Sequence, residues 1–145
     1  MTRLTPRTHR LRIERPPYDP VDTVLETRSL LLHDLSHYAV EAELGVEHGF
    51  YGLLASGVGL EALREQQLDP EVWEQLMAVE FQVVKLQTAF KRGDVLVGDR
   101  AWRRLRSLHG AWSKARMGEA VQLDWPASDP VLVPASGIGD ALTAT

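Results

Sequence analysis

Histidine and carboxylate side chains recur at helical spacing between His33 and Glu41. Residues three and four apart share one face of an α-helix, so His33, His37 and Glu41 would form one stripe. Asp34 would share a second, overlapping stripe with His37 and Glu41. Each stripe would bring nitrogen and oxygen donors together within the width of one helix, which is what a divalent metal ion requires of its ligands. The spacing therefore predicts a candidate metal site.

One helix can supply two or three ligands, so a further donor has to come from elsewhere. We take as candidate metal ligands His33, Asp34, His37, Glu41, Glu47 and His48, with Glu80 as a further candidate. Zinc is the favoured ion, although such ligands also suit iron, manganese or nickel. The alternative is that these residues are structural: Asp34 caps a helix, Glu41 is solvated and His37 is hydrogen-bonded where it is partly buried.

The stretch from His33 to Gly52, HDLSHYAVEAELGVEHGFYG, resembles the core motif of a family of uncharacterised bacterial proteins, H-D-L-x-H-[FY]-x-V-E-x-x-L-G-x-x-x-G-F-[WY]-G. That family carries no established activity. The stretch is also similar, more weakly, to the HDxxH motif of a ubiquinone-biosynthesis family that is taken to hold zinc. In that motif a glutamate follows twelve residues after the second histidine, where this chain has Gly49. The second resemblance implies zinc chemistry at His33, Asp34 and His37.

Motifs of other enzyme classes are missing from the sequence. It has H-D-x-x-H rather than H-E-x-x-H, and an aspartate reaches a metal-bound water less well as general base. Neither G-x-S-x-G nor a P-loop occurs. The absence of cysteine excludes disulfides, thiolate zinc sites and cysteine nucleophiles. The sequence therefore leaves open the substrate, the reaction and whether the protein is an enzyme.

The elements around the candidate site can be predicted from local patterns. Alternation over Thr8–Arg15 and Ala120–Trp125 indicates strands, and the second could return beside the N-terminal strand. Residues 21–31 could form a second strand that completes a hairpin with the first, and a helix over residues 24–32 is the alternative. We expect helices over about 34–44, 47–55, 60–68, 70–92 and 100–117. The last two, joined by a short connection, should pack antiparallel.

These elements predict an α+β fold, a mostly helical domain with a small antiparallel sheet from N- and C-terminal strands. Residues 1–126 should form a single domain. Residues 127–145 are rich in Pro, Ala, Ser and Gly and lack basic side chains, so we expect a flexible C-terminal tail.

The composition is that of a globular domain and argues against a nucleic-acid-binding or membrane-spanning protein. Apolar residues make up 44% of the chain and charged residues 25%, as in ordinary globular domains. The net charge of −4 makes a nucleic-acid partner a weak expectation, and the basic residues between Lys91 and Arg116 are better explained as a solvated helix face. No apolar run reaches the roughly 20 residues of a membrane span, and no signal peptide is evident. We expect a cytoplasmic protein.

Two classes of function remain open at this point. In the first, the protein binds a divalent metal through His33, His37 and Glu41, and zinc is the favoured ion. Asp34 would then be a further ligand or would orient one, and the metal could activate water or a substrate carbonyl. In the second, the protein is a non-catalytic binding or assembly module, and its helices form a homodimer or a partner surface.

Overall fold

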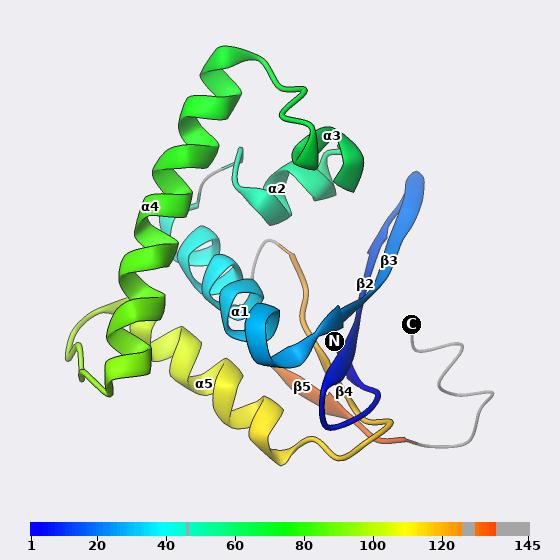
Figure 1. Ribbon diagram of the computed structural model, residues 1–145, viewed down its shortest axis with the longest axis vertical. Helices are drawn as coiled ribbons and strands as arrows, with labels where there is room; N and C mark the ends of the chain where they lie inside the picture. The colour runs from blue at the N-terminus through cyan, green and yellow to red at the C-terminus, as the bar shows by residue number, and fades with distance from the viewer. Residues whose placement is uncertain (46, 126–129, 136–145) are drawn as a thin grey trace.

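The computed structural model describes residues 1–45, 47–125 and 130–135. Over these residues, helices combine with a five-stranded antiparallel sheet (Figure 1), which confirms the predicted α+β class. N-terminal and C-terminal strands share this sheet in the order β3-β2-β1-β4-β5. The strands are β1 (Thr2–Arg3), β2 (Thr8–Arg15), β3 (Tyr18–Glu26), β4 (Ala120–Gln122) and β5 (Val131–Val133).

The predicted hairpin is confirmed. β2 and β3 pair antiparallel, with Leu11 opposite Thr23 and Ile13 opposite Val21. Side chains alternate across this hairpin: Leu11 and Val21 turn inward and are buried, while Arg12 and Glu14 on the other face of β2 are partly or fully exposed. The helical alternative for residues 24–32 is also partly confirmed, since the chain passes from β3 at Glu26 directly into a helix at Thr27.

The two-residue strand β1 joins the halves of the sheet. It pairs with β2 on one side and with β4 on the other, where Thr2 lies opposite Ala120. The C-terminal strand therefore returns beside β1 rather than beside Thr8–Arg15, and a strand of two residues leaves no periodic signal in a sequence. β5 lies within the segment expected to be a tail. Of that segment, residues 127–129 and 136–145 are outside the described part of the chain.

The helices are α1 (Thr27–Leu44), α2 (Phe50–Ala55), α3 (Leu60–Arg64), α4 (Pro70–Arg92) and α5 (Arg100–Lys114). α1 begins well before the predicted start at residue 34, whereas α2, α3 and α5 are shorter than predicted. Gly45 and Gly93 end α1 and α4 in the left-handed conformation, where glycine has no steric penalty. Asp99 caps α5 by accepting a hydrogen bond from the Trp102 N–H at 2.8 Å.

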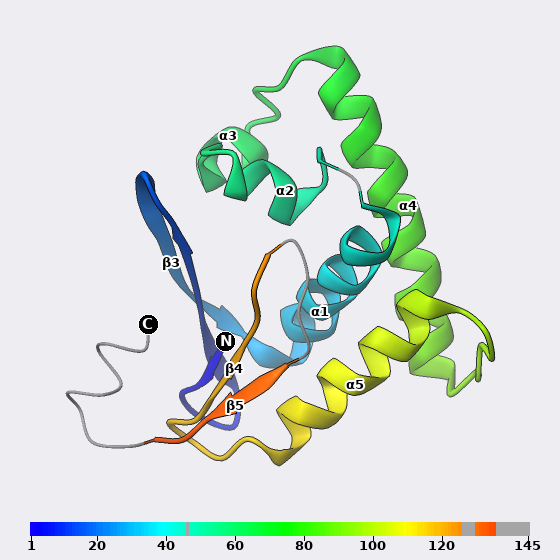
Figure 2. The same cartoon turned by 180° about the vertical axis from the view of Figure 1, so that it is seen from behind.

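α1 is the central helix of the core. It packs against β2 and β3 on the sheet side and against both α4 and α5 on the other (Figures 1 and 2). Fully buried side chains of α5, such as Leu105 and Leu108, meet Val83 of α4 and Ala39 of α1 in one cluster. α4 and α5 diverge from their connection instead of lying side by side, so the predicted antiparallel packing is wrong. None of the described helices is long and apolar enough to cross a bilayer.

Candidate metal centre

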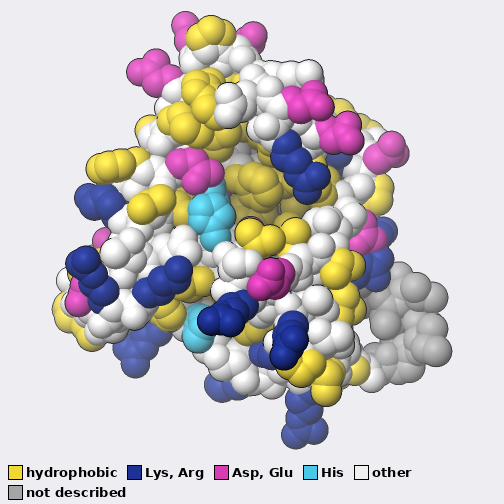
Figure 3. Space-filling model, viewed as in Figure 1, with side chains coloured by type: hydrophobic (Ala, Val, Ile, Leu, Met, Phe, Trp, Pro, Cys, Tyr) yellow, Lys and Arg dark blue, Asp and Glu magenta, His cyan; other side chains and the backbone are white. Residues whose placement is uncertain are grey.

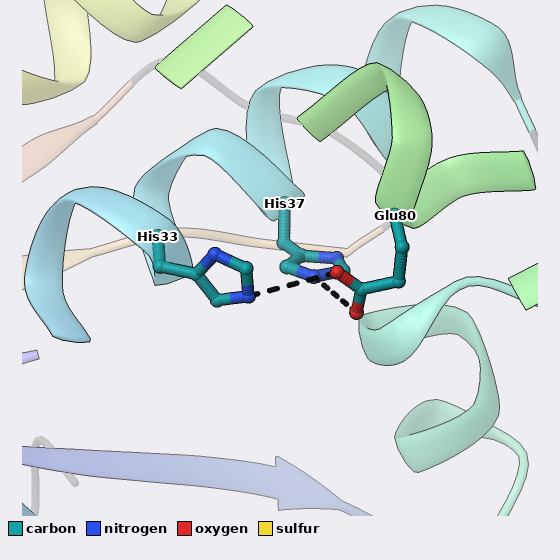
Figure 4. Close-up of side chains that lie close together, drawn as sticks. All are labelled: His33, His37 and Glu80. Carbon is teal, nitrogen blue, oxygen red and sulfur yellow. Dashed lines mark ion pairs between the residues drawn. The ribbon is translucent and has the colours of Figure 1, made fainter. Parts of the chain in front are cut away.

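Three side chains from two helices converge on one point (Figure 4). His33 and His37 lie one turn apart on α1, and Glu80 comes from α4. One ligand atom of each lies within 4.8 Å of the other two. The Glu80 carboxylate bridges the rings, with Oε1 2.9 Å from His37 Nε2 and Oε2 3.8 Å from His33 Nε2. We call this group the His33–His37–Glu80 cluster.

Each imidazole ring is held by its other nitrogen. His37 Nδ1 lies 3.1 Å from Glu41 Oε2, and His33 Nδ1 lies 3.1 Å from the amide oxygen of Gln87 on α4. A carboxylate or amide oxygen can only accept, so Nδ1 is the donor in both rings. Nε2 of each ring is thereby directed toward Glu80. Metal-binding histidines are oriented in the same way, by an oxygen that accepts from the nitrogen that does not bind the metal.

The cluster brings opposite charges into close contact. Burial lowers the pKa of His37, but hydrogen bonds and attraction from Glu41 and Glu80 outweigh burial and raise the pKa to about 9. Burial raises the pKa of Glu80, but the hydrogen bond and charge of His37, with a contribution from His33, outweigh it and lower the pKa. At neutral pH, His37 is therefore an imidazolium between two carboxylates. A metal cation would replace the proton on Nε2.

Glu41 is not a member of the cluster, but its carboxylate accepts a hydrogen bond from Nδ1 of His37, which is a member. The Glu41 side chain is fully buried, so the alternative in which Glu41 is solvated is wrong. Glu41 Oε1 accepts hydrogen bonds from the backbone N–H groups of Tyr51 at 2.9 Å and Gly52 at 3.1 Å, in the first turn of α2. Helix α2 has Gly49 at its N-cap, which offers no side chain, and the Glu41 carboxylate satisfies these N–H groups instead. Glu41 therefore connects the cluster to α2.

Asp34 turns away from the cluster toward the sheet. Its Oδ2 lies 3.6 Å from Nε2 of His9, a fully buried residue of β2. Nδ1 of His9 lies 3.1 Å from the hydroxyl oxygen of Thr27, at the start of α1. Because α1 begins at Thr27, Asp34 is inside the helix and is not its cap. These polar contacts position α1 on β2, and the structure does not bring Asp34 to the His33–His37–Glu80 cluster.

Glu47 and His48 also lie outside the cluster. Glu47 is exposed to solvent. His48 Nδ1 lies 2.6 Å from the amide oxygen of Gln75 on α4. The left-handed turn at Gly45 ends α1, so residues that follow it no longer share the face of α1 that carries His33 and His37.

One side of the cluster is open to solvent. The side chains of His33 and Glu80 are 33% and 32% exposed, whereas that of His37 is 2% exposed. Figure 3 shows histidine and acidic side chains together at the edge of a hollow with a hydrophobic floor. An ion and a water molecule can therefore approach from solvent, while His37 stays fixed by the protein.

Aromatic rings in contact with one another lie between the cluster and a cavity. The His37 ring contacts Phe50, with ring centroids 5.5 Å apart, and Phe50 contacts Tyr51 at 5.2 Å. Tyr51 lines a cavity of about 630 Å³ between β2 and the segment around β4. Its apolar lining includes Leu11, Ile13, Val121, Leu123 and Trp125. A cavity of this size accommodates a small organic molecule.

The two histidines of the cluster are predictable from their spacing in the sequence, whereas Glu80 is only a further candidate there. The signal for Glu80 is a carboxylate beside the core stripe of α4, where it needs a partner. The sequence does not predict the contact of Gln87 with His33, the capping role of Glu41 or the contact between His9 and Asp34. Each of these depends on how separate elements pack together, and no local pattern carries that information.

Comparison of the chain with protein-family models, with curated proteins and with solved structures finds no match.

Proposed function

We propose that the protein binds a divalent metal ion, in the first place zinc, through Nε2 of His33, Nε2 of His37 and the carboxylate of Glu80. The observation that supports this most directly is the convergence of these three ligand atoms within 4.8 Å. Zinc bonds of about 2.0 Å in a tetrahedron separate ligand atoms by about 3.3 Å. Small rotations of the partly exposed His33 and Glu80 side chains would reach that spacing.

The ligand set favours a site with an open position. Two histidines and one carboxylate are used by catalytic zinc sites, which keep the fourth position for water. Bound zinc supplies a water of lowered pKa or polarises a carbonyl. The solvent-open side of the cluster and the nearby cavity support a metal-assisted reaction, such as hydrolysis, on a small organic substrate. The absence of cysteine and the resemblance of the motif favour the cytoplasm of a bacterium.

Calorimetric titration tests the metal proposal. Protein without an affinity tag is stripped of metal with a chelator, dialysed and titrated with zinc. We expect one ion per chain. His37→Gln and Glu80→Gln should each weaken zinc binding by at least about tenfold, because even the loss of an outer hydrogen-bonding partner costs that much.

His48→Gln is the matched control, since His48 is not a member of the His33–His37–Glu80 cluster. It should bind zinc as tightly as the unaltered chain. Absence of zinc binding, or equal binding by Glu80→Gln, would contradict the proposal. Circular dichroism of each variant would show that its fold is retained.

A second candidate function is that of a homodimeric assembly module. It is supported by large apolar side chains that lie exposed on α4, namely Met77, Phe81 and Val84. The two functions are compatible, because these side chains are not members of the His33–His37–Glu80 cluster.

A further inference from the structure

Helix α4 carries an apolar stripe that no described element covers. Phe81 is 65% exposed, Val84 56% and Met77 38%, and Trp73 is half-buried one turn earlier. These residues recur at helical spacing, so they form one face, which we call the free face of α4. The core face of the same helix is separate and carries Leu76, Val79, Val83 and Leu86.

The position of α4 in the molecule leaves its free face accessible. In both ribbon views α4 lies at the edge of the fold, with α1 and α5 on one side of it (Figures 1 and 2). In Figure 3, hydrophobic side chains lie on the surface on the side of α4. An exposed stripe of this kind on a water-soluble helix is typical of a surface that another chain covers.

Charge along α4 indicates what that chain is. The N-terminal half carries Glu71 and Glu74, and the C-terminal half carries Lys85, Lys91 and Arg92. Within the described part of the chain, these residues form no ion pair. A surface that is acidic at one end and basic at the other is complementary to itself when two copies run antiparallel, and it repels itself when they run parallel.

We propose that two copies of this chain associate through the free faces of their α4 helices, antiparallel, about a two-fold axis at the level of residue 79. This inference deepens the assembly function proposed above and does not depend on the metal. This axis sets Met77 of one copy against Phe81 of the other, and both side chains are exposed members of the free face. It also brings Glu74 of one copy close to Lys85 of the other, since these residues lie five and six positions from the axis on opposite sides of it.

The dimer should be reversible. A helix of 23 residues is about 35 Å long, so a pair of such helices buries less surface than a standard stable interface. Sedimentation velocity over a wide concentration range should therefore show a monomer that converts to dimer. The equilibrium should be unchanged when zinc is replaced by chelator, which separates this inference from the metal proposal.

Phe81→Glu places a charge at the centre of the proposed interface and should raise the dimer dissociation constant by about tenfold or more. The matched control is Val24→Glu on β3, because Val24 is an apolar residue of similar exposure (60% against 65% for Phe81) on another element. The control should dimerise like the unaltered chain. A chain that stays monomeric overturns both the inference and the assembly function. A dimer that Phe81→Glu leaves intact overturns the inference alone.

Orientation is tested by crosslinking, which is unambiguous because the chain has no cysteine of its own. Glu74→Cys and Lys85→Cys chains should form a disulfide when they are mixed, and each variant alone should form much less. A dimer whose Glu74→Cys chains crosslink readily with each other would run parallel, and the antiparallel arrangement would be overturned.

Discussion

His37 is the residue on which the candidate metal centre depends most. Its ring is almost fully buried and lies between Glu41 of its own helix and Glu80 of α4. A charge in such a place is stable only when its partners remain, because an uncompensated buried charge is costly. Nε2 of His37 therefore carries either a proton or, as we propose, a metal ion, and the two compete for the same lone pair.

This competition predicts how pH acts on the metal-free protein. The pKa of His37 is raised from 6.5 to about 9 in the folded state. A raised pKa means that the folded state holds the proton more tightly than the unfolded state does, so the stabilisation is complete below pH 6.5 and is lost as the pH rises through 9. Urea unfolding in the presence of chelator should show a midpoint that falls across this window.

His37→Gln removes the titrating group and should flatten that part of the profile. If the unaltered chain were equally stable at both ends of the window, the proposed charge state of His37 would be wrong. Zinc affinity should move in the opposite direction and increase with pH across the same window, because the proton on Nε2 becomes easier to displace.

At the scale of elements, the contact between α1 and α2 determines how His37 is held. Glu41 reaches across from α1 and caps the first turn of α2 while it accepts from His37. The approach is close enough that a Cβ at Gly49 would overlap the Glu41 carboxyl group. Glu41 cannot move aside cheaply, since it would lose hydrogen bonds in a buried place.

Gly49→Ala should therefore destabilise the protein by about 1–3 kcal/mol, the usual cost of overpacking. Gly59→Ala is the matched control: Gly59 is the N-cap of the short helix α3, has a similar φ (−81° against −85°) and has open space around its Cα. Both changes share the small effect of replacing a capping glycine, so the difference between their urea midpoints reports the overlap with Glu41. Equal midpoints would show that Glu41 does not hold α2 as described.

At the scale of the whole molecule, the proposed ion would connect two helices that are far apart in sequence. His33 and His37 belong to α1 and Glu80 to α4, and both helices contribute to the hydrophobic core. An ion that binds the folded state and not the unfolded chain stabilises the fold by mass action. The metal centre would therefore act on global stability as well as on chemistry.

Thermal unfolding should reveal this effect. Zinc at about a hundredfold excess over its dissociation constant should add about 2.7 kcal/mol and raise the melting temperature by several degrees. Magnesium should leave it unchanged, because magnesium prefers an octahedral set of oxygen ligands. Glu80→Gln should lose most of the zinc effect. An equal rise in Glu80→Gln would indicate that zinc binds elsewhere.

Local patterns are sufficient to predict much of the architecture. The apolar stripe of α4, its start at Pro70 and its glycine stop at Gly93 are properties of neighbouring residues, and the structure confirms them. The alternation that predicts β2 and β4 is equally local. The start of α1 at Thr27 is not predicted, because residues 27–33 are compatible with either strand or helix until β3 has formed its hairpin with β2.

By itself, the sequence determined that helices dominate, that strands from both ends of the chain form a sheet and that two histidines share one face of α1. Only the tertiary structure decided which carboxylate joins them. Asp34, Glu41 and Glu80 are all acids near a core, and their sequence patterns do not distinguish a contact with His9, a cap on α2 or a partner of the two histidines. The reason is that each role is set by the element that lies opposite the side chain, and those elements meet only when the sheet, α2 and α4 pack around α1.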